Sequence, residues 1–325
     1  MSPLLTLTTA LALVSTAIWA DPLPSWSDTG AKTRIISFVE KVTDPASDHY
    51  VPPSDRIATF DNDGTLWAEQ PMYFQLIFAI DVIGEMARED PSILTTDTLR
   101  SAAAKDYMAV IAGGKPAILE VMKLSHAGMT VEALQARVAD WILTATHPQT
   151  GLRYDQMTYQ PMIELLRYLR DEDFKTYIVS GGGIHFMRVF SDKAYGIPSE
   201  QVLGTYTETE YRVENGVPAI IKAPAIGFVD DKEGKPLNIE RIIGKRPIIA
   251  GGNSDGDFAM LQWTTAGRGP RLGLIIHHTD SEREFAYDRD SHIGQLVDGL
   301  DQGPDLGWLI VDMAKDWSRI YTGAR

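Results

Sequence analysis

Cysteine is absent from the 325-residue chain, which excludes disulfide bonds, thiolate catalysis and zinc sites with cysteine ligands. Basic residues are also scarce, since 30 Lys and Arg stand against 44 Asp and Glu and the formal net charge is −14. Nucleic acids and anionic membrane surfaces require a basic footprint on the protein that binds them. We therefore expect no nucleic acid among the partners of this chain.

Long hydrophobic runs are missing except at the N-terminus. Residues 1–20 carry no charge, contain an apolar stretch from Leu4 to Trp19 and end on the small residue Ala20. This segment resembles a secretory signal peptide, although it lacks the usual Lys or Arg near its start, and an uncleaved amphipathic segment is the alternative. No other run approaches the ~18–20 apolar residues of a membrane span. We expect a periplasmic or secreted protein with no membrane contact once residues 1–20 are removed.

Short apolar segments alternate with amphipathic segments along most of the remaining chain, which predicts strands and helices in turn. A hairpin is expected over residues 204–221, where Asn215 and Gly216 are typical of a tight turn. Further strands are expected at 56–60, 176–179, 247–250 and 271–276, and helices at 31–42, 161–170, 185–195 and 237–243.

The order of these elements predicts an α/β fold. Strands that alternate with helices imply a mostly parallel, Rossmann-like sheet with helices on both faces. Residues 72–152 have a helical pattern with no convincing strand, so we predict that they form an inserted α-helical cap. The core is then built from residues 21–71 and 153–325.

Polar residues follow three of the predicted strands, at Asp61, Ser180 and Asn253. In sheets of this kind ligands bind beyond the carboxyl ends of the strands. We therefore expect these three residues to converge on one site.

The sequence DNDGT, which begins at Asp61, is the strongest chemical signal. A carboxylate at a strand end can attack a phosphoryl group, and Asp63 can protonate the leaving oxygen and later deprotonate a water. Two adjacent carboxylates repel unless a cation lies between them, and Mg²⁺ prefers oxygen ligands. A polar turn is the alternative interpretation, because Asp-Gly is common in turns.

Two segments carry a resemblance to a known family. FDNDGTLW resembles the first motif of the haloacid dehalogenase (HAD) superfamily, and YIVSGG resembles the second. The helical insert is similar to the cap of phosphoserine-phosphatase-like members. The resemblance implies that Asp61 is the nucleophile and that Ser180, Gly181 and Gly182 bind phosphoryl oxygens.

The third and fourth motifs of the family are less well defined here. Lys235 lies where the family has its motif lysine, just before a predicted helix, and Lys222 and Lys232 are the alternatives. The resemblance implies that this lysine neutralises the phosphoryl group. In the fourth motif Asn253 stands where an Asp is usual, and Asp257 follows four residues later.

The resemblance also implies a set of metal and substrate contacts. The Mg²⁺ ligands would be the carboxylate of Asp61, the backbone carbonyl of Asp63, and Asn253 or Asp257. Glu69 lies close behind the first motif and would contact the substrate.

These residues together predict a Mg²⁺-dependent phosphomonoester hydrolase that acts on a small phosphorylated substrate through an aspartyl phosphate. Asp63 disfavours a dehalogenase, because a halide leaving group needs no proton. A mutase or phosphotransferase would use the same intermediate, and a non-catalytic exported protein that binds phosphate esters is a further alternative.

A serine esterase is the alternative from another enzyme class. Residues 252–256 match G-x-S-x-G with Ser254 at its centre, and Asp280 and His292 follow in the order that an α/β-hydrolase requires.

The signal-peptide assignment has a direct test. We expect N-terminal sequencing of the protein exported by a bacterial host to begin at Asp21. Replacing Ala20 by Arg should block the cleavage, because the site requires a small residue. An exported protein that keeps residues 1–20 would contradict the assignment.

Overall fold

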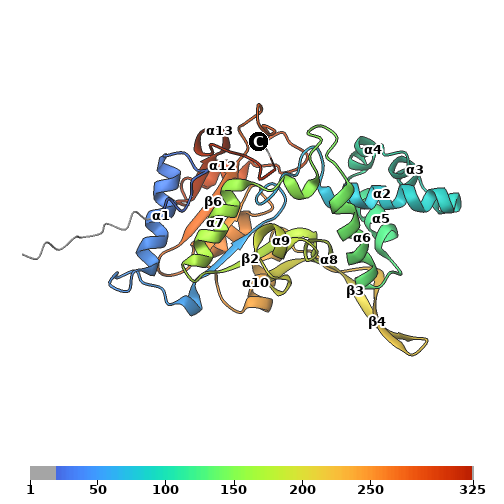
Figure 1. The fold of residues 1–325 in the computed structure, drawn as a ribbon, viewed down its shortest axis with the longest axis horizontal. Helices are drawn as coiled ribbons and strands as arrows, with labels where there is room; N and C mark the ends of the chain where they lie inside the picture. The colour runs from blue at the N-terminus through green and yellow to red at the C-terminus, as the bar shows by residue number, and fades with distance from the viewer. Residues whose placement is uncertain (1–19, 324–325) are drawn as a thin grey trace, which may run out of the picture.

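A computed structural model describes residues 20–323, and of the predicted signal peptide only Ala20 falls inside this range. Its centre is one seven-stranded sheet (Figure 1). The strands are β1 (Ile57–Phe60), β2 (Lys175–Gly183), β3 (Val202–Glu214), β4 (Val217–Phe228), β5 (Ile249–Gly252), β6 (Leu272–His277) and β7 (Leu309–Asp312). Their order is β4-β3-β2-β1-β5-β6-β7, and every neighbouring pair is parallel except the β3–β4 hairpin.

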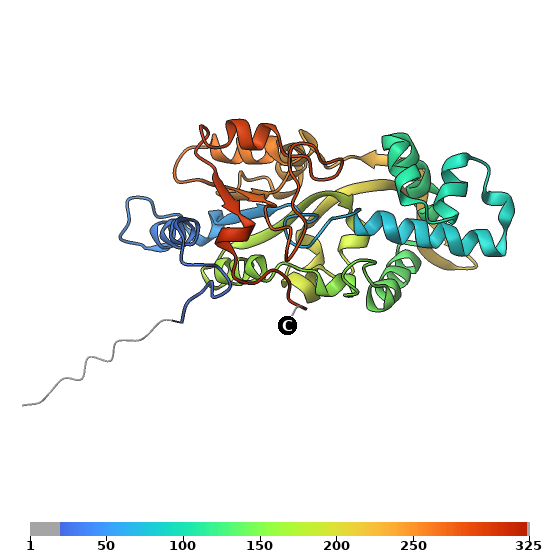
Figure 2. The ribbon, with the colours of Figure 1, turned by 90° about the horizontal axis from the view of Figure 1, so that it is seen from above.

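Helices cover both faces of this sheet, so the predicted α/β class is confirmed (Figure 2). The longer helices are α1 (Gly30–Thr43), α2 (Phe74–Glu89), α5 (Gly114–His126), α6 (Val131–Thr144), α7 (Gln160–Asp171), α10 (Gly234–Ile243) and α11 (Phe258–Thr265). The shorter ones are α3 (Asp97–Ala103), α4 (Tyr107–Ala112), α8 (Ile184–Met187), α9 (Ser191–Tyr195), α12 (Asp298–Gln302) and α13 (Met313–Asp316). Four single turns of 3₁₀ helix lie at Pro53–Asp55, Pro91–Ile93, Tyr154–Gln156 and Ser199–Gln201.

The two faces of the sheet bury separate hydrophobic clusters. Successive side chains of a strand point to opposite faces. In β6, Leu274 and Ile276 belong to the cluster that includes α1 and α7, whereas Ile275 belongs to the cluster that includes α10 and α11. A strand that is buried on both sides has a continuous run of apolar residues in the sequence, and this pattern predicts β1, β5 and β6.

Three local details differ from the predicted elements. The strand predicted at 176–179 continues as β2 to Gly183, with a register shift between Ser180 and Gly183. The single helix predicted at 185–195 is wrong, because hydrogen bonds of the i to i−3 type at Val189 and Phe190 end α8 and separate it from α9. Lys235 lies in the first turn of α10 and not ahead of that helix.

Helices α2 to α6 lie beyond one side of the sheet, next to the outer part of the β3–β4 hairpin (Figures 1 and 2). The loop between α5 and α6 pairs with the hairpin, because Gly128 N donates to Lys222 O and Lys222 N donates to Met129 O, both at 2.9 Å. We refer to α2–α6 as the cap helices. The limits of the cap at 72 and 152 stay a prediction.

The segment that follows the predicted cleavage point is folded onto the core. The backbone N–H and the hydroxyl of Ser25 donate to the buried carboxylate of Glu164 at 2.8 and 2.7 Å. Trp26 packs edge-on against Trp317, with ring centroids 5.9 Å apart. Between residues 20 and 323 no helix is long and apolar enough to cross a membrane.

Candidate active site

Asp61 is the first residue after β1, and it lies beside Lys235 at the carboxyl edge of the sheet. Lys235 Nζ is 2.9 Å from Asp61 Oδ1 and 2.6 Å from Asp257 Oδ1, and it donates to Val179 O at 3.0 Å. The Lys235 side chain is only 2% exposed. One ammonium group therefore joins the residue after β1, an interior residue of β2 and the β5–α11 loop.

The charges of this cluster shift the pKa values of its members. Burial raises the pKa of Asp61 to about 7, with a further contribution from the nearby carboxylates of Asp257 and Asp63, whereas the positive charge of Lys235 acts in the opposite direction and lowers it. Burial alone would lower the pKa of Lys235, but Asp257 and Asp61 raise it well above its ordinary value. Lys235 therefore stays positively charged, and it favours the ionised form of Asp61.

Asp63 is held in place by a buried tryptophan four residues further along the chain. Trp67 Nε1 donates to Asp63 Oδ1 at 2.7 Å, and the Trp67 ring stacks on Phe190 with centroids 4.4 Å apart. A Cβ atom on Gly182 would lie 3.5 Å from Asp63 Oδ2. The second carboxylate oxygen of Asp63 therefore faces the Ser180–Gly182 segment. Burial raises the pKa of Asp63 to about 6.

Ser180, Gly181 and Gly182 form the irregular part of β2 where the register shifts. The Ser180 hydroxyl is buried and accepts a hydrogen bond from Gly182 N at 3.2 Å. Two backbone N–H groups next to a hydroxyl form a suitable cradle for an anion. The structure thus brings the first and second predicted motifs together.

Asp257 is hydrogen-bonded to protein groups through both of its carboxylate oxygens. Asp257 Oδ2 accepts from Asn253 N, Ser254 N and the Ser254 hydroxyl at 3.0, 3.1 and 3.2 Å, while its Oδ1 contacts Lys235. Both oxygens of Asp257 are therefore engaged by protein groups, and Asp257 orients the lysine and the loop.

Asn253 lies at the junction of the first and fourth motifs. Its Oδ1 accepts from the Thr65 hydroxyl at 3.1 Å, and its Nδ2 donates to Glu69 Oε1 at 2.7 Å. Of the two alternatives for the third metal ligand, Asn253 retains more acceptor capacity, because an amide oxygen has two lone pairs and only one is used.

A hard divalent cation fits the chemistry of this site. Asp61 Oδ1 is buried and lacks a hydrogen bond of good geometry, although it lies within ion-pair distance of Lys235. Within residues 20–323 no three His, Asp or Glu side chains are arranged to hold a metal. A metal here would need other oxygen atoms, and the Asp63 backbone carbonyl and the Asn253 amide could supply them. The ligand set stays a prediction.

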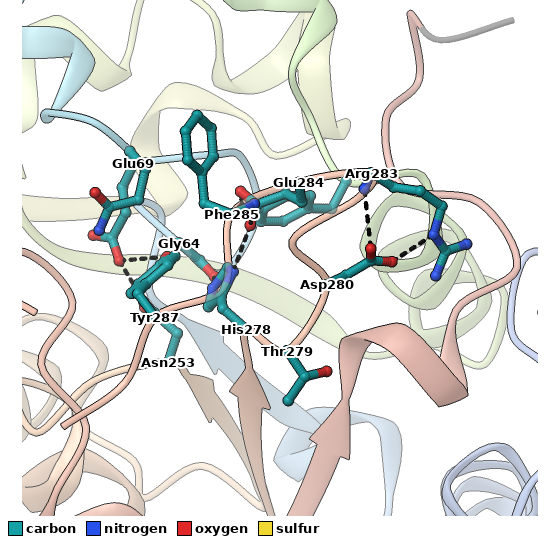
Figure 3. Close-up of polar contacts among 12 residues, drawn as sticks. Gly64, Glu69, Asn253, His278, Thr279, Asp280, Arg283, Glu284, Phe285 and Tyr287 are labelled. Carbon is teal, nitrogen blue, oxygen red and sulfur yellow. Dashed lines mark hydrogen bonds and ion pairs between the residues drawn. The ribbon is translucent and has the colours of Figure 1, made fainter. Parts of the chain in front are cut away.

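Glu69 contacts Asn253 and Tyr287 in a buried position (Figure 3). Its Oε1 also accepts from Tyr287 OH at 2.8 Å, and the residue is only 2% exposed. Burial and the charge of Asp63 raise the pKa of Glu69 well above its ordinary value. Glu69 as a substrate contact stays a prediction.

Gly64 has φ +71°, and a Cβ there would lie 2.1 Å from Asn253 Nδ2, so only glycine fits this turn.

The segment after β6 supplies residues that the sequence interpretation missed (Figure 3). His278 Nε2 lies 2.8 Å from Gly64 O, and His278 Nδ1 lies 3.2 Å from Glu284 Oε2. The His278 ring also stacks on Tyr287 at 4.3 Å. His278 thus stabilises the turn of the first motif from more than 200 residues away. The sequence does contain one indication of this role: His278 comes directly after β6, so it lies at the same edge of the sheet as Asp61.

The residues required by the esterase alternative do not assemble. The Ser254 hydroxyl donates to Asp257 and accepts from Gly256 N. Asp280 is paired with Arg283, as Figure 3 shows, and His292 is exposed. Of the three lysines considered for the third motif, Lys235 is the one beside Asp61, whereas Lys232 is exposed and Lys222 lies in the hairpin.

Comparison with known proteins identifies the family. A family profile of haloacid dehalogenase-like hydrolases matches residues 58–262, which is more than half of the chain. The chain therefore belongs to the haloacid dehalogenase-like hydrolase family, and the predicted resemblance is confirmed. No curated protein matches the chain.

Two solved structures share the fold, and a third match is weaker. A protein of unknown function from Anaerococcus prevotii DSM 20548 is similar over 80% of this chain and 89% of its own, with 17% identity and a TM-score of 0.54. One from Bordetella pertussis Tohama I covers 80% of this chain and 99% of its own, with 16% identity and a TM-score of 0.50. A phosphoserine phosphohydrolase-like protein from Francisella tularensis subsp. tularensis SCHU S4 covers 77% and 99%, with 14% identity and a TM-score of 0.36.

The packing of Glu69 can be tested with a pair of glycines. Gly294 has φ +68°, and a Cβ there would lie 2.0 Å from Glu69 Oε1, whereas Gly307 has φ +76° and open space around it. We expect Gly307→Ala to lower the free energy of unfolding by about 1–2 kcal/mol through backbone strain alone. Gly294→Ala should lower it by about 1–3 kcal/mol more, because overlap adds to strain. Chemical denaturation measures both, and equal effects would contradict the described packing.

Proposed function

We propose that the protein is a Mg²⁺-dependent phosphomonoester hydrolase that acts through an aspartyl phosphate. The observation that carries the proposal is a buried Asp61 beside Lys235, with Asp63 facing the Ser180–Gly182 segment. Family membership supports hydrolysis, and the second carboxylate supports a leaving group that requires a proton.

In the first half-reaction, a carboxylate oxygen of Asp61 attacks phosphorus and the bond from phosphorus to the ester oxygen breaks. Asp63 transfers its proton to the departing oxygen, which leaves as an alcohol. A pKa of about 6 suits Asp63 to this role, because a general acid works best near the operating pH.

In the second half-reaction, Asp63 removes a proton from a water that attacks the phosphorus of the aspartyl phosphate. The bond from Asp61 to phosphorus breaks, inorganic phosphate leaves and the carboxylate of Asp61 is regenerated. Asp63 regains the proton that it gave away, so the cycle closes.

Charge stabilisation is divided among three groups. Lys235 contacts Asp61 directly, and it would offset the negative charge that develops on the phosphoryl oxygens. Ser180 and the N–H groups of Gly181 and Gly182 would orient those oxygens. Mg²⁺, held by Asp61, the Asp63 carbonyl and Asn253, would supply further positive charge when bound.

Export of the protein belongs to the same proposal. The uncharged apolar N-terminus supports secretion to the periplasm or the medium, and the substrate would then be a small phosphate ester in that compartment.

The covalent step is tested with one substitution and one metal. We expect wild-type protein to release phosphate from p-nitrophenyl phosphate with Mg²⁺ and to lose this activity in EDTA. Asp61→Asn should lower kcat by roughly a thousandfold or more, because an amide cannot form the acyl phosphate. Thermal unfolding of Asp61→Asn would show that the fold is intact.

Two other results of this assay would contradict the proposal. A folded Asp61→Asn protein with more than a tenth of the wild-type rate would overturn the covalent scheme. Binding of phosphate esters without turnover would favour a non-catalytic binding protein.

The role of Asp63 is tested by the leaving group. We expect Asp63→Asn to lower kcat for an alkyl phosphate by about 10²–10⁴-fold, the usual contribution of general acid–base catalysis. The loss in the first half-reaction should be smaller with p-nitrophenyl phosphate, whose leaving group needs no proton, and burst kinetics would isolate that step. Asp192→Asn, on the exposed surface of α9, is the matched control. Equal first-step losses for both esters would show that Asp63 is not the acid.

A further inference from the structure

Lys222 is a second buried lysine, and its surroundings differ from those of Lys235. It is 4% exposed and lies on β4. Its Nζ contacts His185 Nδ1 at 3.0 Å and donates to the Thr207 hydroxyl at 2.7 Å. Both partners are uncharged when they accept from an ammonium. No Asp or Glu among residues 20–323 forms an ion pair with Lys222.

His126 gives an independent observation at the same place. It ends α5 and is 5% exposed, and its Nδ1 lies 2.6 Å from the Ser125 hydroxyl. Its Nε2 is buried and has no hydrogen-bond partner. Gly128, two residues after His126, donates its N–H to Lys222 O at 2.9 Å, so His126 lies in the segment that pairs with the strand of Lys222. Burial and the positive charge of Lys222 lower the pKa of His126 to about 3. We call Lys222, His185 and His126 the Lys222 cluster.

The Lys222 cluster lies on the cap side of the proposed phosphoryl site. His185 follows Gly182 by three residues, and with 3.8 Å between successive Cα atoms their Cα atoms are at most about 11 Å apart. The β3–β4 hairpin continues past the end of β2, where Gly183 pairs with Thr205, and Lys222 pairs with Thr209 further along. The cluster is therefore bounded by the segment after β2, the hairpin and the cap helices.

A buried ammonium without a counter-ion is unfavourable unless something else supplies negative charge. An apolar residue of similar length would fill the same space without that penalty. Burial lowers the pKa of Lys222 to about 8, so the group still binds a proton at neutral pH. The missing component at this position is an anion, and Nε2 of His126 would be one donor to it in the tautomer that carries its hydrogen there.

We propose that Lys222, His185 and His126 form a subsite for a second anionic group of the phosphorylated substrate. This inference rests on the proposed function and narrows it: the ester hydrolysed at Asp61 carries a carboxylate or a second phosphate a few bonds from the scissile phosphoryl group. Lys222 supplies the positive charge. The packing of the cap helices on the hairpin keeps water away from the ammonium group and the anion that it binds.

Binding of three phosphonates, which cannot be hydrolysed, tests the subsite without relying on turnover. They are propylphosphonate, 3-phosphonopropionate and propane-1,3-diphosphonate, which share a three-carbon chain and differ in the group at its far end. We expect calorimetry with excess Mg²⁺ to show that at least one of the two doubly functional ligands binds ten times more tightly than propylphosphonate. Which of them does so distinguishes a carboxylate from a second phosphate.

Two substitutions then locate the source of this preference. Lys222→Met should remove it and bring the Kd of the preferred ligand to within about threefold of that of propylphosphonate, because the desolvated charge is gone. His126→Leu should weaken the same preference in part, and it tests the cluster even if Lys222→Met fails to fold. Lys123→Met, which changes an exposed lysine of α5, is the matched control and should keep the full preference.

Thermal unfolding separates ligand binding from a structural role. A substrate subsite predicts that Lys222→Met unfolds at the wild-type temperature or above it, since a buried unpaired charge is removed. A lower unfolding temperature together with an unchanged ligand preference would overturn the proposal and show that Lys222 is structural.

The remaining outcomes separate the subsite from the proposed function. Equal binding of all three phosphonates by a protein that hydrolyses p-nitrophenyl phosphate would overturn the subsite and leave the phosphatase proposal standing. A preference that survives both Lys222→Met and His126→Leu would also overturn it. A protein that neither binds phosphonates nor hydrolyses p-nitrophenyl phosphate would overturn both proposals together.

Discussion

The ion pairs of Lys235 are the interaction on which the rest of the site depends. One buried ammonium contacts the carboxylates of Asp61 and Asp257 and the carbonyl of Val179. These groups come from different elements, namely the end of β1, the start of α11 and the interior of β2, so the lysine fixes their relative positions as well as their charge. Removing one member of a buried ion pair leaves the others uncompensated, which is far more costly than losing an exposed pair. The geometry around Asp61 therefore depends on Lys235 remaining charged.

The turn that follows β1 is stabilised from several sides at once. Trp67 donates to Asp63, His278 contacts the carbonyl of Gly64, and Glu69 accepts from Asn253. A catalytic carboxylate must be held within a fraction of an ångström, and such neighbours provide that rigidity. Aromatic packing has a chemical role here, because the Trp67 ring that stacks on Phe190 also carries the N–H that orients Asp63.

Lys235 and Lys222, two of the three lysines that are buried among residues 20–323, illustrate how the surroundings of a residue decide its role. Lys235 is matched by two carboxylates and is therefore suited to hold a catalytic group in place. Lys222 contacts a histidine and a threonine and has spare positive charge. The positive charge of Lys235 is balanced within the protein, whereas the proposed subsite at Lys222 gains its negative charge from a ligand.

The sequence by itself determined the α/β class, the strands that lead to Asp61 and Ser180, and the membership of the HAD family. Continuous apolar runs and a fixed local motif carry that information, because both depend only on neighbouring residues. The sequence favoured Lys235 for the contact with Asp61 and left Lys222 and Lys232 as alternatives. It did not determine that both oxygens of Asp257 are engaged, or that Trp67, Tyr287 and His278 support the turn. Those contacts join residues far apart in the chain, and only the packing of the sheet and its helices brings them within hydrogen-bond distance.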